Sequence, residues 1–348
     1  MKKIFLTLIV SLIICSFSFS QTVKVLTLTK ANLDSLTELD ISGKDLSSLK
    51  FKTSKNLTVK SLDLSKNKFR KFPRCILKLK NLEKINLNGN QFANIPRRLK
   101  KLKHLQEVSL NDMPLHLNKR SFNRIKQVRK VQLINCALKN LPSQIEKLKF
   151  VQSLNLAKNQ LSDLPETMRK LDSLSTFTLY QNNFKTIPTS VFELSNLENL
   201  DVYYNHLSEI PDEVRKLKKL KKLFLSYNEL EKVPESLGEL IGLRELYLHH
   251  NKLTALPFTF FQLKNLTIVH LNNNNFSSFP NVVLAMDSIE EIDLSTNLIE
   301  DLPIGLTEMK NLKAFYFRES KIDLTSPKHK KDAQVLDELI KAGVLVRD

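Results

Sequence analysis

Residues 220–242 read LKKLFLSYNELEKVPESLGELIG, and residues 243–265 read LRELYLHHNKLTALPFTFFQLKN. The two stretches align without gaps. Each has leucine at its first, fourth and sixth positions, asparagine at its ninth and proline at its fifteenth. The same 23-residue frame runs from Leu36 to Asn311 and contains twelve full units. Repetition at this period is typical of proteins built from stacked supersecondary units.

The spacing of the leucines predicts how each unit folds. In L-x-x-L-x-L the last two leucines are two residues apart, which is strand periodicity. Each unit can therefore add one short strand to a parallel sheet, with its leucines inward and the intervening residues outward. One unit cannot bury its own apolar face, but stacked units share a continuous core.

Two further positions of the repeat suit the turns that leave and return to the sheet. The asparagine amide can donate to and accept from backbone groups at a buried turn. Proline fixes φ and suits the start of a helix, so a short helical segment is expected after it, as in residues 235–240. The asparagines are Asn67, Asn90, Asn159, Asn182, Asn205, Asn228, Asn251, Asn274 and Asn297, and the prolines are Pro73, Pro96, Pro142, Pro165, Pro188, Pro211, Pro234, Pro257, Pro280 and Pro303.

The pattern L-x-x-L-x-L-x-x-N-x-L-x-x-L-P-x-x-I-x-x-L-x-x resembles the leucine-rich-repeat family, and exported bacterial members in particular. The resemblance covers nearly the whole chain after residue 20. It implies an α/β solenoid, or horseshoe, with a parallel sheet on the concave face and short helical segments on the convex face. It also implies that the asparagines form a structural ladder.

Both ends of the chain depart from the repeat. Lys2 and Lys3 precede an apolar run, and Ser18-Phe19-Ser20 offers small residues for cleavage, so residues 1–20 are expected to be a signal peptide. A retained anchor is the alternative, but the run is short for a bilayer and nothing later is apolar enough to span one. Export to the periplasm, cell surface or medium follows. Residues 21–35 are expected to be a partial repeat.

The segment 312–348 is expected to be a second partial repeat followed by a capping helix. Ser326-Pro327 is a helix-start signal and Gly343 a helix-stop signal. Between them Val335, Leu336, Leu339 and Ile340 recur at helical spacing. Terminal units need such a cap because their core face would otherwise meet water.

Some units depart from the pattern. In residues 105–127 Met113 replaces the asparagine, Lys119 replaces the proline and Pro114 is added. We interpret this unit as a local irregularity that bends the solenoid, with an interaction site as the alternative. Cys136 stands at an asparagine position, and with Cys75 it is expected to be a free, buried thiol, since two distant cysteines make no disulfide framework.

The outward positions of the predicted strands carry the candidate binding residues. All six tyrosines fall at the fifth, seventh or eighth positions of a unit, and five lie between residues 180 and 247. Strands lie about 4.8 Å apart, so these side chains would form a patch roughly 20 Å long. The predicted partner-binding residues are Tyr180, Asp201, Tyr203, Tyr204, Phe224, Tyr227, Tyr247, His249, His250 and His270.

Tyrosine offers a large contact area and a hydroxyl at a low cost in rotamer entropy. The sequence therefore predicts a non-catalytic binding protein that recognises a macromolecule, most often a protein, on its concave face. The alternative is a carbohydrate-binding protein whose tyrosines stack on cell-wall or host glycans. A third interpretation is that the outward rings only stabilise the sheet through cross-strand contacts.

Other functions find little support in the residues. No metal or other cofactor is expected, because His249 and His250 are adjacent and would point to different sides of a strand. No catalytic motif such as H-E-x-x-H or G-x-S-x-G occurs, so no enzymatic activity is expected. We also expect a monomer.

The chain is strongly basic, at +18, or +16 once Lys2 and Lys3 are removed. Most of this charge follows the prolines and is expected on the convex side, as a solvated face or a weak attractant for anionic polymers. Nucleic-acid binding is not expected, since the protein is exported and aromatic residues are not interleaved with the charge. The clusters are Arg97, Arg98, Lys100, Lys101 and Lys103, and Arg215, Lys216, Lys218 and Lys219.

Overall fold

The computed structural model describes residues 24–29, 36–52 and 57–347. The expected signal peptide, residues 1–20, lies outside the described residues, as does most of the expected partial repeat 21–35. Within the latter, β1 (Lys24–Thr29) pairs in parallel with β3 (Leu46–Lys52), and the two form a sheet of their own.

The chain divides into two compact units. The first comprises the described residues up to Leu138 together with Lys147–Val151, and the second comprises Lys139–Glu146 together with the residues from Gln152 onward. In the first unit, successive three-residue strands pair in parallel, each with the strand of the next repeat. These strands are β2 (Glu38–Asp40), β4 (Ser61–Asp63), β5 (Lys84–Asn86), β6 (Glu107–Ser109) and β7 (Lys130–Gln132).

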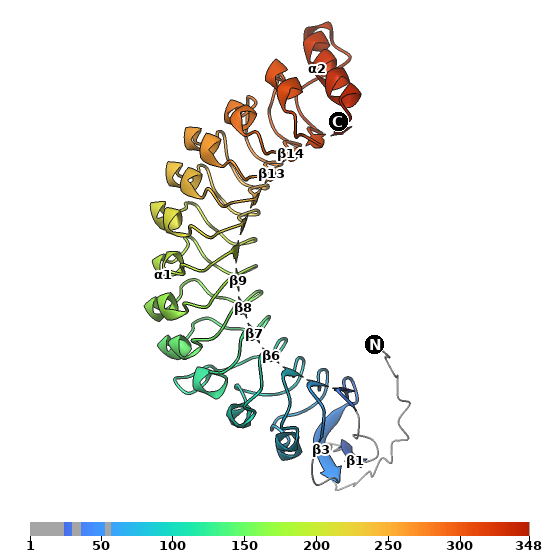
Figure 1. Ribbon diagram of the computed structural model, residues 1–348, viewed down its shortest axis with the longest axis vertical. Helices are drawn as coiled ribbons and strands as arrows, with labels where there is room; N and C mark the ends of the chain where they lie inside the picture. Colours follow the sequence, from blue (N-terminus) through green and yellow to red (C-terminus); the bar gives the residue numbers. More distant parts are fainter. Residues whose placement is uncertain (1–23, 30–35, 53–56, 348) are drawn as a thin grey trace. The chain divides into compact units, whose positions relative to one another are not determined.

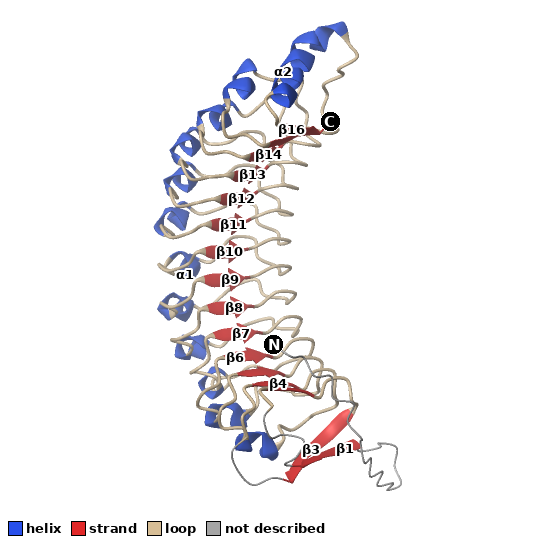
Figure 2. Cartoon of the chain, turned by 45° about the vertical axis from the view of Figure 1, so that its right-hand side comes forward, coloured by secondary structure: helices blue, strands red, loops and turns tan. Residues whose placement is uncertain are grey.

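The second unit repeats the arrangement with nine strands in chain order, and each strand except the last two pairs with residues 23 positions further on (Figure 2). The register is therefore the register of the sequence repeat. The strands are β8 (Ser153–Asn155), β9 (Thr176–Thr178), β10 (Asn199–Asp201), β11 (Lys222–Phe224), β12 (Glu245–Tyr247), β13 (Ile268–His270), β14 (Glu291–Asp293), β15 (Ala314–Tyr316) and β16 (Leu345–Arg347).

Short helical segments lie on the side of each unit opposite the strands (Figure 1). Most are 3-10 turns of five residues that begin directly after a repeat proline. The proline precedes the helix instead of occupying its first turn. Its carbonyl accepts the first hydrogen bond of the helical turn, as that of Pro234 does from the N–H of Leu237. The segments are η2 (Arg74–Lys78), η3 (Arg97–Lys101), η4 (Phe122–Arg124), η5 (Ser143–Lys147), η6 (Glu166–Lys170), α1 (Thr189–Phe192), η7 (Asp212–Lys216), η8 (Glu235–Glu239), η9 (Phe258–Gln262), η10 (Asn281–Ala285) and η11 (Ile304–Glu308).

The core of each unit is a stack of the repeat leucines. In the repeat that begins at residue 220, Leu220, Leu223 and Leu225 are completely buried. The residues between them are less buried, so the alternation expected of a strand with one face inward is present. We call the side of the sheet away from the helices the open face. The third, fifth and seventh positions of each repeat lie on it.

The asparagine ladder is present and satisfies buried backbone groups, as the sequence predicts. Asn228 donates through Nδ2 to the carbonyls of Val202 (3.1 Å) and Leu225 (2.8 Å). Its Oδ1 accepts from the N–H of Leu207 at 3.0 Å. Each asparagine thus connects its own turn to the turn of the preceding repeat, and the buried loops remain satisfied.

Cys136 shows how the ladder tolerates a change. The thiol donates to the carbonyl of Leu110 at 3.1 Å, the bond that an asparagine makes to the preceding repeat. The N–H of Leu115 is bonded to the carbonyl of Cys136 instead of to a side chain. Burial raises the pKa of Cys136 to about 12 and that of Cys75 to about 11. Within the described residues neither cysteine is in a disulfide, as expected, but Cys75 is only partly buried.

The irregular repeat, residues 105–127, is held by polar contacts where the others have proline. Oδ1 of Asn94 accepts from Ser121 Oγ at 2.9 Å and from Arg124 Nη1 at 3.1 Å, which ties the repeat to the preceding one. Its helical turn, η4, has only three residues. Met113 is buried at the asparagine position, and Oδ1 of Asn111 accepts from Ile134 N at 2.8 Å.

A helix lies over the last repeat in the stretch where the sequence predicts one. The 3-10 turn η12 (Pro327–His329) leads into α2 (Lys330–Lys341), and Gly343 follows with φ of +85°. Val335, Leu336 and Leu339 are buried. The prediction that Ile340 belongs to the apolar face of this helix is wrong, because its side chain is 57% exposed.

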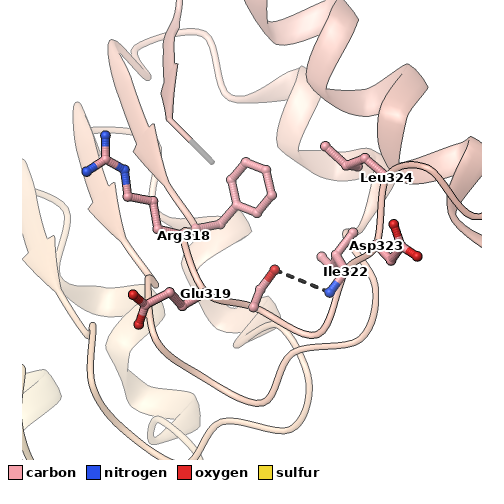
Figure 3. Close-up of a pocket in the computed structure, with 7 residues that line it drawn as sticks. Arg318, Glu319, Ile322, Asp323 and Leu324 are labelled. Carbon is pink, nitrogen blue, oxygen red and sulfur yellow. Dashed lines mark hydrogen bonds between the residues drawn. The ribbon is translucent and has the colours of Figure 1, made fainter.

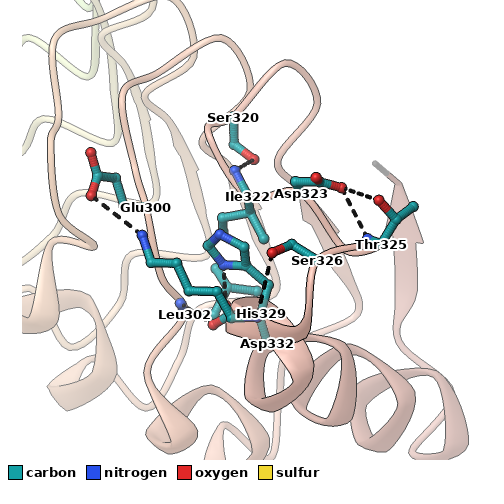
Figure 4. Close-up of polar contacts among 10 residues, drawn as sticks. Glu300, Leu302, Ser320, Ile322, Asp323, Thr325, Ser326, His329 and Asp332 are labelled. Atoms are coloured by element: carbon teal, nitrogen blue, oxygen red, sulfur yellow. Dashed lines mark hydrogen bonds and ion pairs between the residues drawn. The ribbon is translucent and has the colours of Figure 1, made fainter.

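Asp332 of α2 closes the end of the last repeat with a polar contact that the apolar pattern does not reveal. Its buried carboxylate accepts from the backbone N–H of Leu302 at 2.8 Å and lies 2.8 Å from His329 Nδ1 (Figure 4). The N–H of Leu302 therefore has a side-chain partner in the buried end of this repeat.

The ladder predicts a large loss of stability from a single truncation. We expect Asn228→Ala to lower the free energy of unfolding by about 2–4 kcal/mol, because the N–H of Leu207 loses its partner in the core and the carbonyls of Val202 and Leu225 each lose one of two donors. Urea unfolding monitored by circular dichroism measures the change. Asn183→Ala, at an exposed asparagine, is the control and should cost little. Equal losses in the two variants would contradict a ladder role.

Candidate functional site

The nine predicted aromatic and histidine side chains form one continuous set of ring contacts on the second unit. Each ring centroid lies within 6.5 Å of at least one other in the set. We call this set the aromatic cluster. It consists of Tyr180, Tyr203, Tyr204, Phe224, Tyr227, Tyr247, His249, His250 and His270. Asp201, the remaining predicted site residue, lies on β10 directly beside Phe224 in the sheet register.

The fifth repeat position forms the first row of the cluster. Phe224 and Tyr247 stack face to face, with centroids 4.8 Å apart and an interplanar angle of 5°. His270 meets Tyr247 edge-on at 5.0 Å. These residues are register partners on β11, β12 and β13, so the parallel strands set the spacing of the rings.

The seventh position forms a second row with one polar interruption. Tyr180 stacks on Tyr203 at 5.4 Å. The next residue in the row is Ser226, which is fully buried, and its Oγ is hydrogen-bonded to Nδ1 of His249 at 2.8 Å. This bond fixes the orientation of the His249 ring, which contacts Tyr203 at 5.9 Å across the short serine.

The eighth position forms the third and most exposed row. Tyr227 stacks on Tyr204 at 4.4 Å and on His250 at 3.9 Å, and Tyr204 is 45% exposed. All three residues have positive φ, of +58° for Tyr204, +53° for Tyr227 and +52° for His250. The turn that leaves each strand imposes this conformation on the eighth residue of the described repeats, and Gly43 and Gly89 occupy it in two of them.

Bulky side chains rarely adopt this backbone conformation, which costs about 1 kcal/mol or more per residue. Three consecutive repeats nonetheless place large rings there. The rings regain part of this cost by stacking, since an aromatic pair contributes about 0.5–1.5 kcal/mol beyond its buried area. The eighth residues of other repeats, such as Lys66, Lys158 and Gln181, adopt the same conformation, so it is a property of the repeat.

The left-handed turn also corrects one expectation from the sequence. Adjacent residues on a strand point to opposite sides, but the rings of His249 and His250 lie on the same side, with centroids 5.7 Å apart. The strand geometry has ended before His250 is reached. Among the residues that the structure describes, no group of three or more His, Cys, Asp or Glu is arranged to hold a metal ion.

The cluster is uncharged at neutral pH in its central part. Burial, followed by the neighbouring His270 and His250, lowers the pKa of His249 to about 4. Burial lowers the pKa of His250 as well. Burial raises the pKa of Tyr203 and of Tyr247 to about 12, with Glu245 adding to the effect at Tyr247. The site therefore presents neutral rings and hydroxyl groups.

Two carboxylates that the sequence reasoning missed border the cluster. Glu245 accepts from the hydroxyl of Tyr247 at 3.1 Å and is paired with Lys222 at 2.7 Å. Glu291 lies 2.9 Å from Nε2 of His270. Both occupy the third repeat position, two residues before a fifth-position residue on the same side of a strand. That spacing is the signal that could have found them.

Asp201 is the one carboxylate within the predicted set. It is half-buried, and burial raises its pKa to about 6. Its Oδ1 accepts from the N–H of Tyr203 at 3.1 Å. A carboxylate placed next to rings, without an ion pair in the described part of the chain, is a group whose charge is poorly compensated.

The basic clusters lie on the helical side of their own units, on η3, η7 and the turns that follow them, as the sequence predicts. Several of these lysines are paired, for example Lys216 with Glu193 at 2.7 Å and Lys218 with Glu239 at 3.0 Å. A shallow pocket of about 350 Å³ beside the second cluster is lined by Lys218, Lys221 and Arg244, among others.

A second shallow pocket, of about 220 Å³, lies near the carboxyl end (Figure 3). Arg318, Glu319 and Asp323 are among its lining residues, and the hydroxyl of Ser320 accepts from the N–H of Ile322 at 3.3 Å. None of the residues that line either pocket belongs to the aromatic cluster, which is an open surface.

The strained eighth position makes a testable prediction. We expect Tyr204→Gly to be more stable than Tyr204→Ala by about 1 kcal/mol, because only glycine adopts φ of +58° without steric cost. Thermal unfolding of the two variants measures the difference. Tyr203, one residue earlier and without positive φ, should give the opposite order for the same pair of substitutions. The same order at both sites would contradict the strain.

The raised pKa of Asp201 predicts a pH-dependent stability difference. The folded state retains the proton between pH 3.8 and about 6, so wild-type stability falls as the pH rises through that window and stays lower above it. We therefore expect Asp201→Asn to be more stable than wild type by about 1 kcal/mol above pH 6, after allowance for partial exposure, with the difference vanishing below pH 3.8.

Urea midpoints of the two proteins across this pH range measure the difference. Asp293→Asn, at the same repeat position, measures the background effect of the substitution. A difference between Asp201→Asn and wild type that does not change with pH would show that the carboxylate is not destabilised by burial.

Comparisons with known proteins agree on the family. A family model described as a leucine-rich repeat region matches residues 112–232, and a model described as a leucine rich repeat matches residues 34–92 and 241–299. A search of curated proteins finds no sequence match. In the described part of the chain, no helix is both long and apolar enough to span a membrane.

Solved structures show the same fold. A leucine-rich-repeat protein of Leptospira interrogans is 26% identical with a TM-score of 0.72, and the match covers 90% of each chain. An internalin of Listeria monocytogenes is 17% identical with a TM-score of 0.72, covering 94% of this chain and 89% of that one. A structure of the Drosophila Toll–Spatzle complex is 21% identical with a TM-score of 0.70, covering 91% of this chain and 44% of that one. The chain belongs to the leucine-rich-repeat family and is an α/β solenoid of that class.

Proposed function

We propose that the chain is an exported, non-catalytic binding protein that recognises a protein partner on the open face of its second unit, through the aromatic cluster. The observation that carries the proposal is the cluster itself, nine rings in mutual contact on a face that the core does not need. Export rests on the signal-peptide pattern of residues 1–20.

The packing of the rings favours a protein over a glycan. A sugar binds an aromatic side chain by covering its face, but Tyr227 already has one neighbour stacked on it from each adjacent repeat. The face of Phe224 is likewise occupied by Tyr247. Ring edges and hydroxyls remain for a partner, and a mixture of apolar edges with hydrogen-bonding groups suits a protein surface.

The form of the site supports a large partner. The cluster occupies an open sheet surface on five consecutive repeats and is not enclosed in a cavity, whereas small molecules are usually held in concave pockets. The similar Toll structure is a complex with Spatzle, and repeat solenoids in general use extended faces of this kind.

A combined variant tests the proposal. We expect Tyr204→Ala/Tyr227→Ala/Tyr247→Ala to weaken partner binding about a hundredfold or more, since each truncated tyrosine at such a surface costs on the order of 1–2 kcal/mol. Affinity capture with the chain from residue 21 onward identifies the partner, and biolayer interferometry with the purified partner measures the change.

Tyr316→Ala is the matched control, because Tyr316 occupies the same fifth position on β15 but none of its ring contacts joins it to the cluster. It should bind as the wild type does. Circular dichroism establishes that each variant is folded. Unchanged binding by the folded triple variant would contradict the proposal. If no protein partner is found and a glycan array yields a ligand whose binding depends on these tyrosines, the partner is a carbohydrate and not a protein.

A further inference from the structure

The fifth position of the repeat has a structural role that needs an oxygen atom but not a charge. The carboxylate Oδ1 of Asp63, Asp201 and Asp293 accepts from the N–H two residues later. The amide oxygens of Asn86 and Asn155 make the same bond in other repeats. An aspartate and an asparagine therefore close this turn equally well, and the turn does not explain the negative charge at residue 201.

The second carboxylate oxygen distinguishes Asp201 from its counterpart in the first unit. Oδ2 of Asp63 accepts from Nδ2 of Asn86, its register partner on the next strand, at 2.9 Å. The register partner of Asp201 is Phe224, which has no side-chain donor. Within the described residues no donor contacts Oδ2 of Asp201, and the group is half-buried.

Asp201 has aromatic neighbours in the sheet on two sides. Phe224 is beside Asp201 on β11, and Tyr203 follows it by two residues on the same side of the sheet, where it stacks on Tyr180. Side chains at paired positions of neighbouring strands are about 5 Å apart. On the other neighbouring strand, β9, the partner is the small Thr178. The carboxylate is thus a short, partly exposed side chain at the border of the rings.

The charge of the open face is opposite to that of the chain. At the third, fifth and seventh positions of the repeats on β9 to β14, the carboxylates are Asp201, Glu245, Glu291 and Asp293, and the only lysine or arginine is Lys222, so the formal charge is −4 + 1 = −3. The whole chain carries +18. A cationic group is therefore attracted to this face and repelled from most of the remaining surface.

The geometry points to a subsite for one cationic side chain, lysine or arginine, of the protein partner, formed by Asp201 with Phe224 and Tyr203 beside it. This inference rests on the proposed function and names the chemistry of its partner. The cation donates to the free Oδ2 while Oδ1 keeps its bond to the N–H of Tyr203. The face of Phe224 that is not stacked on Tyr247 can attract the cation as well. The pKa of Asp201, raised to about 6, still leaves the carboxylate mostly charged at neutral pH.

Display of random peptides tests the subsite without knowledge of the natural partner. Peptides are selected on wild type, on Asp201→Asn, on Asp293→Asn and on the triple tyrosine variant. Asp201→Asn keeps the turn, as Asn155 does in another repeat, and removes only the charge. We expect lysine or arginine to be enriched at one peptide position on wild type and on Asp293→Asn, and not on Asp201→Asn.

One selected peptide then completes a double-mutant cycle. Replacing its arginine by citrulline, or its lysine by acetyl-lysine, should weaken binding to wild type about tenfold or more and leave binding to Asp201→Asn nearly unchanged. The Asp293→Asn variant should respond as wild type does. Measurement at low ionic strength gives the largest effect.

The outcomes separate this inference from the proposed function. Peptides that lack a preferred cation, or an equal loss in wild type and Asp201→Asn, overturn the subsite. If such peptides still lose binding to the triple tyrosine variant, the proposed function stands and only the cation subsite is overturned. If no selected peptide depends on the tyrosines, both are overturned.

Discussion

The structure depends on the buried asparagine amide that joins each repeat to the one before it. An amide such as that of Asn228 supplies two donor hydrogens and an acceptor at a turn that has no water to serve it. Because the bond spans neighbouring repeats, every unit must have the same length, and the side chains of one unit fall in register with those of the next. The ring rows on the open face are a product of that register.

The repeat made much of the fold predictable from sequence. Strand positions, ladder and helical side all follow from apolar periodicity and from polar groups that must be satisfied, both of which are local. The polar closure of the last repeat by Asp332 was not predictable in this way. Its acceptor role depends on the N–H of Leu302, 30 residues away, and the pattern of apolar residues gives no sign of it. Ile340 fits the helical spacing but lies at the solvent edge of α2.

The candidate site was predictable to a similar extent. Placing residues on numbered repeat positions brought the tyrosines and histidines together, because position within the repeat determines position on the face. The pattern does not give backbone conformation at the eighth position, so the left-handed turn that sets His250 beside His249 was missed. The pattern also does not show which of several nearby polar side chains contacts a given ring. The contacts of Glu245 with Tyr247 and of Glu291 with His270 therefore required side-chain positions.

The spacing of the strands restricts what can lie across the open face. Neighbouring strands of a sheet are about 4.8 Å apart, while an extended chain advances about 3.3 Å per residue. An extended chain that crosses the strands at right angles therefore matches the repeats only where three of its residues span two of theirs, about 10 Å in both cases. Side chains of an extended chain alternate between its two sides, so residues three apart point in opposite directions, and equivalent side chains meet the face again only after six residues, or four repeats.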